Sequence, residues 1–157
     1  AMAYAVGADF IRFEAYVDNR AGSFGYIEAC STPLAKIMKD YPSDTMIFAD
    51  VQIAETYGVP NVPINELAGN AKGHDAHAVI VTENDQNKKI TPEDVKSMRE
   101  VMGDFPIIVG AGVKPGNVLD YMEYCDAVIV GRGFKTGDRV DPKLVKEFME
   151  IVHKKYN

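Results

Sequence analysis

A short apolar run followed by a helix-like segment recurs five times in this chain of 157 residues. Such alternation is typical of a parallel sheet with right-handed crossovers, which makes the fold class α/β. The strand candidates are residues 9–17, 45–52, 76–82, 106–110 and 126–131. The helix candidates are residues 26–39, 64–72, 92–102, 115–122 and 142–155.

Each of the last two strand candidates ends in a glycine-bearing turn, Gly110-Ala111-Gly112 and Gly131-Arg132-Gly133. Glycine lets backbone N–H groups approach an anion because no Cβ intervenes, and a following helix N-terminus adds unpaired donors. Consecutive turns of this kind are typical of the phosphate grip after strands 7 and 8 of a (β/α)8 barrel. We predict that these six residues bind a phosphate group. The alternative is that the glycines only permit tight strand-to-helix turns.

If these turns mark strands 7 and 8, the first strand candidate is strand 4 of a barrel. Residues 1–157 then form a single, partial TIM-barrel-like domain, a parallel (βα)5 portion with strands 4–8, and the first three βα units are absent. An open piece of this kind has two unpaired edges, so we expect a homo-oligomer or pairing with a missing N-terminal half. A flavodoxin-like doubly wound sheet is the alternative architecture. Polar residues in the first strand disfavour it, because doubly wound strands are apolar on both faces.

Local signals mark several helix ends and loops. Thr91 before Pro92, with acidic residues next, is an N-cap pattern, and Pro33 indicates a break or a helix start. Three long loops, residues 18–25, 53–63 and 83–90, follow strands and are therefore expected on the carboxyl face, where active sites of this architecture lie.

Carboxylates on the first two strand candidates are the best candidates for chemistry. On a two-residue period Arg12, Glu14 and Tyr16 share the face that would point into the barrel. Glu14 is a candidate for proton transfer, although an Arg–Glu pair there could be purely structural. Asp50, near the carboxyl end of the second candidate, is the strongest candidate for a catalytic carboxylate, and a divalent cation is a possible cofactor there.

Three further side chains could contact a substrate at the same edge. Tyr16, Gln52 and Thr82 lie at the carboxyl ends of the first three strand candidates. Core or structural roles are the alternative for each. The scattered histidines and the distant Cys30 and Cys125 form no zinc pattern, so no resident metal is assigned.

The charge and hydropathy patterns exclude several classes of partner. The net charge is −6, whereas nucleic acid or an anionic membrane would require a basic face. No apolar run approaches the roughly 20 residues of a membrane span, and no signal peptide is visible, so a cytoplasmic location is expected. The cysteines are expected to be reduced packing residues. The Lys88-Lys89 pair is interpreted as ordinary solvated charge.

Five short motifs together resemble the BtpA/SgcQ family. They are Gly7-Ala8-Asp9-Phe10-Ile11-Arg12, Ala49-Asp50-Val51, Ala78-Val79-Ile80-Val81-Thr82, Val109-Gly110-Ala111-Gly112-Val113 and the stretch 128–135. The resemblance implies a TIM-like barrel, relatives linked to photosystem I assembly in cyanobacteria, and a sugar-phosphate operon in enteric bacteria. It matches Lys135 to a family lysine, which could reach the phosphate or simply lie at a helix start. Arg132 stands where a small hydroxyl residue is expected, and it could either strengthen phosphate binding or fill the site. The histidine-bearing first strand and the acidic segment after the second strand of the family are absent.

Three functional interpretations follow. The first is a protein that binds a phosphorylated small molecule, a sugar phosphate or nucleotide-like compound, with lyase, isomerase or hydrolase chemistry at Asp50 and Glu14. The second is a non-catalytic assembly or interaction factor. The third is an inactive truncated fragment, since catalysis needs a closed pocket that five units do not provide. Whether the chain is an enzyme is left open.

Overall fold

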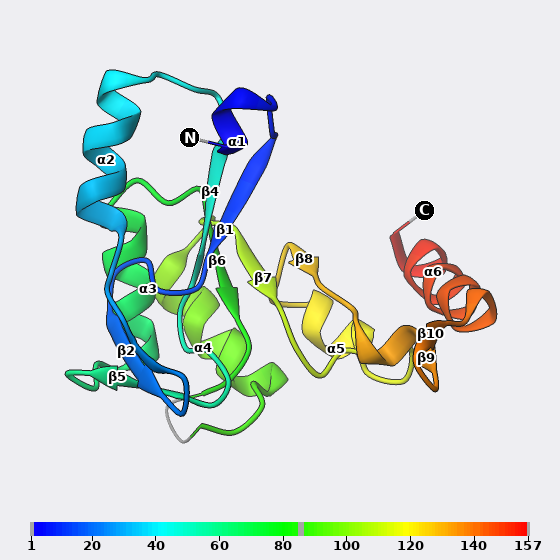
Figure 1. The fold of residues 1–157 in the computed structure, drawn as a ribbon. Coiled ribbons are helices and arrows are strands. Elements are labelled where there is room, and N and C mark those ends of the chain that lie inside the picture. The colour runs from blue at the N-terminus through cyan, green and yellow to red at the C-terminus, as the bar shows by residue number, and fades with distance from the viewer. Residues whose placement is uncertain (1, 85–86, 157) are drawn as a thin grey trace.

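A computed structural model describes residues 2–84 and 87–156. Within these residues the central sheet has five parallel strands, and their spatial order follows the chain (Figure 1). A doubly wound sheet reverses its strand order, whereas the wall of a barrel does not. The predicted portion of a barrel is therefore confirmed, and the flavodoxin-like alternative is wrong. The strands are β1 (Phe10–Phe13), β4 (Met46–Asp50), β6 (Ala78–Val81), β7 (Ile107–Val109) and β8 (Ala127–Val128).

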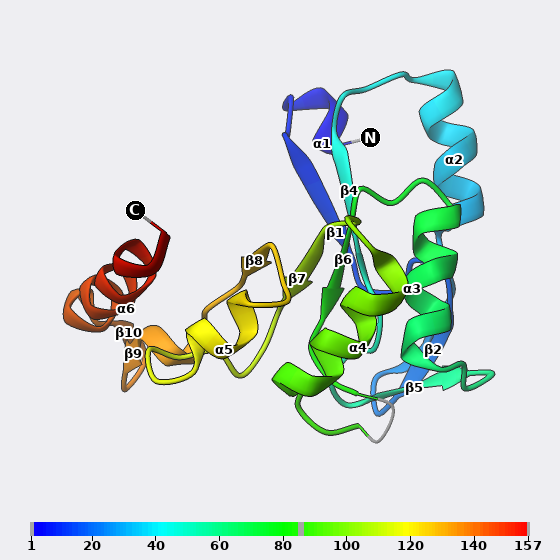
Figure 2. The same ribbon diagram turned by 180° about the vertical axis from the view of Figure 1, so that it is seen from behind.

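Helices follow the strands and form the outer layer, with α3 and α4 side by side on one face of the sheet (Figure 2). Further along the chain, α5 packs on α4 and α6 packs on α5. The helices are α1 (Met2–Ala5), α2 (Ser31–Asp40), α3 (Ile64–Gly73), α4 (Pro92–Met102), α5 (Val118–Met122) and α6 (Pro142–Tyr156). The predicted N-cap of α4 is confirmed, since Thr91 and Asp94 form a capping box. Pro33 lies in the first turn of α2, where proline is tolerated.

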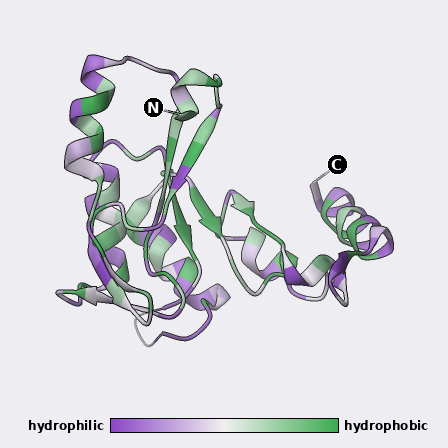
Figure 3. Ribbon diagram, in the orientation of Figure 1, coloured by the Kyte–Doolittle hydropathy of each residue, from purple (hydrophilic) through white to green (hydrophobic). Residues whose placement is uncertain are grey.

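The main core lies between the sheet and the helices, and green strands at the centre of Figure 3 mark its apolar composition. On the outer face Val79, Val81 and Ile107 are fully buried against helical residues such as Met98. The inner face carries a much smaller buried cluster of Ala78, Ile80 and Ile108, with Phe48 packed against it.

The inner face is open along strands β1 and β4. Phe10 is 54% exposed and Met46 is 40% exposed. The ring of Phe10 stacks on Phe48 at 4.6 Å between centroids. The sheet therefore presents apolar side chains to solvent on the side that a closed barrel buries.

Two of the loops expected on the carboxyl face form an antiparallel sheet instead of irregular structure. Strand β2 (Asn19–Gly22) pairs with β3 (Gly25–Ile27) and with β5 (Thr56–Val59). Arg20 of β2 is fully buried and donates to Thr56, Gln52 and Asp18. These hydrogen bonds fix the small sheet to the carboxyl end of β4.

The first strand is shorter than predicted, and this changes the position of Tyr16. Strand β1 ends at Phe13, so the two-residue alternation does not continue beyond it. Tyr16 is buried in the main core, and its hydroxyl donates to the carbonyl of His74. The prediction that Tyr16 shares the inward face with Arg12 is therefore wrong.

Among the described residues no helix is both long and apolar enough to cross a membrane.

Candidate functional site

A groove of about 540 Å³ lies where the two glycine turns meet at the carboxyl ends of β7 and β8. Its walls come from three loops, those that follow β6, β7 and β8. Its polar side chains are all cationic, and no acidic side chain is among the lining residues. All seven residues predicted to bind phosphate line it, together with two lysines that were not predicted: Gly110, Ala111, Gly112, Gly131, Arg132, Gly133 and Lys135, with Lys89 and Lys114.

Two of the glycines permit close packing that no other residue would allow. A Cβ on Gly133 would lie 2.7 Å from the carbonyl oxygen of Val113, so the second turn rests directly on the backbone of the first. A Cβ on Gly110 would lie 2.8 Å from Ile80 and 2.9 Å from Thr82. By contrast, a Cβ on Gly131 would meet open space. The two turns therefore form one surface because Gly133 and Gly110 lack side chains.

Asn117 braces the first turn from the start of α5. Its side-chain oxygen accepts from the N–H of Lys114 at 2.8 Å, and its side-chain nitrogen donates to the carbonyl of Gly112 at 3.2 Å. Gly112 has φ of +79°, a conformation that favours glycine. Among the described residues, none accepts a hydrogen bond from the N–H of Ala111, Gly112 or Gly133. These three donors border the groove and are available to an anion.

The second turn is anchored through the segment that follows it. Phe134, in the 3-10 helix η1 (Arg132–Phe134), packs edge-on against the buried Phe148 of α6 at 5.1 Å between centroids. Lys135 begins the short hairpin of β9 (Lys135–Thr136) and β10 (Arg139–Val140). The side chains of Arg132 and Lys135 therefore project from a backbone that is held on both sides.

Lys89 enters the groove from the loop after β6, and sequence reasoning missed it. Its backbone forms a bridge with Glu83, and its aliphatic stem passes 3.8 Å from the ideal Cβ position of Gly112. The next residue, Ile90, donates to Thr82 and accepts from the hydroxyl of Tyr121. Only the position of the loop beside the first glycine turn distinguishes Lys89 from an ordinary surface lysine.

Asp50 lies outside the groove and forms an ion pair with Arg12. Its carboxylate is fully buried, and both oxygens accept from Arg12, at 2.8–3.1 Å. Burial raises the pKa of Asp50 above its usual value, although the hydrogen bonds from Arg12 oppose this shift. Glu14 is exposed and near enough to influence both charges. Arg12 therefore pairs across strands with Asp50 rather than with Glu14.

Gln52 and Thr82 lie together just beyond the ends of β4 and β6. The Thr82 hydroxyl donates to the Gln52 carbonyl at 2.7 Å, and the Gln52 side chain accepts from Arg20 at 3.2 Å. Gln52 has φ of +74°, which is uncommon for a residue with a Cβ and persists only where the surroundings hold it. Both residues are buried, so the structure places them beneath the carboxyl face.

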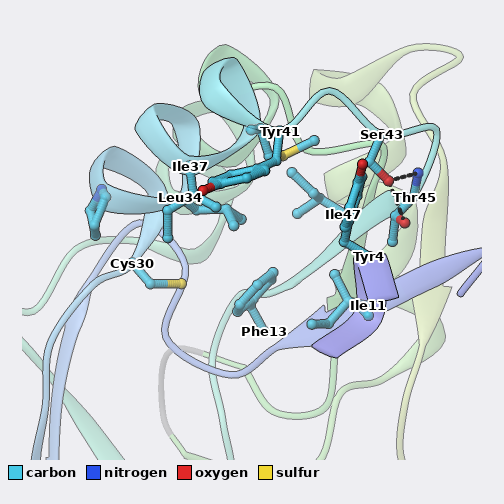
Figure 4. A pocket seen from close by; sticks show the side chains of 13 residues that line it. Tyr4, Ile11, Phe13, Cys30, Leu34, Ile37, Tyr41, Ser43, Thr45 and Ile47 are labelled. Carbon is cyan, nitrogen blue, oxygen red and sulfur yellow. Dashed lines mark hydrogen bonds between the residues drawn. The ribbon is translucent and has the colours of Figure 1, made fainter. Parts of the chain in front are cut away.

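A second cavity, of about 750 Å³, lies between α2 and the outer face of β1 and β4 (Figure 4). Ile11 and Phe13 face Leu34 and other apolar side chains across it. The hydroxyls of Ser43 and Thr45 at its edge bond to one another. This cavity has no charged lining, and it offers nothing to hold a phosphate.

No group of three or more histidine, cysteine, aspartate or glutamate side chains in the described part of the chain could hold a metal ion. A divalent cation at Asp50 would have to displace Arg12 from both carboxylate oxygens. Cys30 and Cys125 are free, as expected, and burial raises the pKa of Cys125 to about 11.

Residues 1–154 match the model of the BtpA family. An uncharacterized mitochondrial protein of Caenorhabditis elegans is 28% identical, over 98% of this chain and 57% of its own length. An uncharacterized protein of Methanocaldococcus jannaschii is 30% identical, over 98% of this chain and 59% of its own length. The photosystem I biogenesis protein BtpA of Synechocystis is 26% identical, over 97% of this chain and 55% of its own length. The chain thus spans little more than half the length of these relatives.

Solved structures with TIM-barrel-like folds share the arrangement of this chain. Native KDPGal superposes with a TM-score of 0.61 at 12% identity, covering 96% of this chain and 61% of that one. The N-(5'-phosphoribosyl)anthranilate isomerase of Pyrococcus furiosus gives a TM-score of 0.60 at 19% identity, covering 97% of this chain and 66% of that one. At these identities the likeness concerns the fold alone.

Proposed function

This chain belongs to the BtpA family. On that premise we propose that it binds a phosphorylated small molecule, a sugar phosphate or nucleotide-like compound, in the groove between the two glycine turns. The observation that carries the proposal is the convergence of both glycine turns with four cationic side chains in one groove. Although the net charge of the chain is −6, four of its 17 lysines and arginines line this groove. Such a concentration is suited to an anion.

The donors match what a phosphoryl group needs. Backbone N–H groups of Ala111, Gly112 and Gly133 supply fixed hydrogen bonds, and Arg132 supplies a planar fork for two phosphate oxygens. Lys135 adds a point charge. The isomerase that shares the fold has a phosphoribosyl group in its name, which supports the same ligand class.

Chemistry on the bound molecule is the finer part of the proposal. We assign proton transfer to Asp50 with Glu14, in a lyase, isomerase or hydrolase reaction. Burial raises the pKa of Asp50 and so favours its protonated form, whereas the hydrogen bonds from Arg12 favour the ionised form. A divalent cation at Asp50 is an alternative proposal. It competes with the ion pair, because a cation could bind only if Arg12 left the carboxylate.

An interaction role is the second candidate. The inner face of the sheet exposes Phe10 and Met46, and β1 is an edge strand whose backbone can pair with another chain. A relative in Synechocystis is described as a photosystem I biogenesis protein. In this role the chain would dock through the open inner face, and the phosphate groove would be regulatory or unused.

Calorimetric titration with inorganic phosphate, hexose phosphates and nucleoside monophosphates tests the first candidate. We expect millimolar or tighter binding that is weakened at least tenfold in Arg132→Ala, because charge-assisted hydrogen bonds typically contribute about 1.5–3 kcal/mol. The matched control is Arg139→Ala, since Arg139 is exposed on β10 and does not line the groove. Absence of binding, or an equal loss in both variants, would contradict the proposal.

A further inference from the structure

Resting on the proposed phosphate site, we propose that the groove accepts a ligand with two phosphoryl groups. The first is held between the two glycine turns, and the second is held by Lys89. The three loops that build the groove follow the three neighbouring strands β6, β7 and β8. The order of the strands therefore determines the order of the binding groups along the groove.

Lys89 and the second turn lie on opposite sides of the first turn. The stem of Lys89 passes 3.8 Å from the ideal Cβ position of Gly112, whereas Gly133 contacts Val113 and Lys114 at the other side. Neighbouring strands are about 4.8 Å apart, so the ends of β6 and β8 are separated by roughly 10 Å. The groove therefore extends across three strands, which is longer than one phosphoryl group requires.

The two glycine turns offer enough donors for one phosphoryl group. It has three non-bridging oxygens. The groove is lined by Ala111, Gly112 and Gly133, whose N–H groups have no acceptor among the described residues, and by Arg132 and Lys135. Lys114 belongs to the first turn, where its Cα lies 3.5 Å from the ideal Cβ position of Gly133. Among the residues that line the groove, Lys89 is the cation that the loop after β6 contributes, with its stem beside Gly112. A second anionic group on the same ligand would meet it there.

The backbone of Lys89 is held in position before any ligand arrives. It bridges to Glu83, and the adjoining Ile90 is bonded on one side to Thr82 at 3.3 Å and on the other to the Tyr121 hydroxyl at 2.8 Å. Ile90 itself is 1% exposed. The backbone of Lys89 is therefore held before binding, and binding orders its side chain.

Lys88 provides a matched control on the same loop. Its backbone accepts from the N–H of Asn84 at 2.8 Å and donates to the Asn84 side chain, so an alanine there preserves both bonds. Lys88 is exposed and is not among the residues that line the groove. Lys88→Ala and Lys89→Ala thus change the net charge equally at adjacent positions, but only Lys89→Ala removes a side chain that lines the groove.

The test is calorimetric titration of the 157-residue chain with inorganic phosphate, inorganic diphosphate and fructose 1,6-bisphosphate, in metal-free buffer at one ionic strength. We expect wild type to bind a two-phosphoryl probe at least tenfold more tightly than phosphate. Lys89→Ala should weaken that probe by about fivefold or more and phosphate by less than twofold. Lys88→Ala should leave all three dissociation constants within twofold of wild type.

The outcomes separate this inference from the function on which it rests. Selective loss in Lys89→Ala supports it, and the probe that loses more tells whether the two phosphoryl groups are adjacent or separate. If phosphate binds but Lys89→Ala behaves as Lys88→Ala, the second position is refuted and the phosphate site survives. If wild type binds none of the probes, the proposed function is refuted and this inference with it.

Discussion

Replacing Gly133 by alanine tests whether contact between the two turns shapes the groove. The added Cβ would lie 2.7 Å from the carbonyl oxygen of Val113 and 3.1 Å from the side chain of Val130. Cβ contacts under 3.0 Å are essentially never seen and ordinary contact begins at 3.4 Å, so the two backbones must move apart by a few tenths of an ångström. Because a backbone carbonyl cannot rotate away as a flexible side chain can, the cost resembles overpacking, about 1–3 kcal/mol.

For a chain of this length, 1 kcal/mol corresponds to about 2–4 °C in Tm, so Gly133→Ala should melt roughly 2–12 °C below wild type. Calorimetric melting measures this directly. The matched control is Gly131→Ala, whose Cβ meets open space, and it should melt closer to wild type than Gly133→Ala does. Gly133→Ala should also weaken phosphate binding. Equal melting temperatures for the two variants would refute the packing argument.

Three further outcomes are expected. Arg99 bonds the carbonyls of Tyr124 and Phe105 and pairs with Asp126, so Arg99→Ala should lower the urea-measured free energy of unfolding by about 1–3 kcal/mol, and a change under about 0.5 would contradict this. Burial raises the pKa of Cys125 from 9.0 to about 11, so the folded chain binds the proton more tightly and loses up to about 2–3 kcal/mol as pH rises through this range. Cys125→Ala should lack that loss, and an identical pH dependence would disprove its origin. The open inner face predicts self-association at tens of micromolar, weakened by Phe10→Lys in sedimentation velocity, and a monodisperse wild-type monomer would rule it out.

The parts of the fold that follow from local chemistry were predictable. Helix α4 has the bounds expected from Thr91-Pro92, because a cap and a first-turn proline act within a few residues. The apolar runs located every strand of the parallel sheet, although β1 and β8 are shorter than expected. The two glycine turns were predicted to meet because parallel neighbours end at the same edge.

What depends on distant partners was not predictable. Arg12 was weighed against Glu14, two residues away, whereas its partner is Asp50, 38 residues along the chain. Lys89 looks like any surface lysine until the strand order places its loop beside Gly112. The hydrogen bonds of Asn117 could not be predicted from the sequence, because they depend on how the preceding turn folds. The spacing of residues along the chain constrains local conformation, whereas these contacts depend on which distant segments the fold brings together.

The antiparallel sheet of β2, β3 and β5 has a consequence for how this protein can vary. It joins the loop after β1 to the loop after β4, residue by residue, from Asn19 opposite Val59 to Gly22 opposite Thr56. An insertion in either loop would shift this register and withdraw Arg20 from Thr56 and Gln52. Because the two loops share this register, homologues should lengthen or shorten them together.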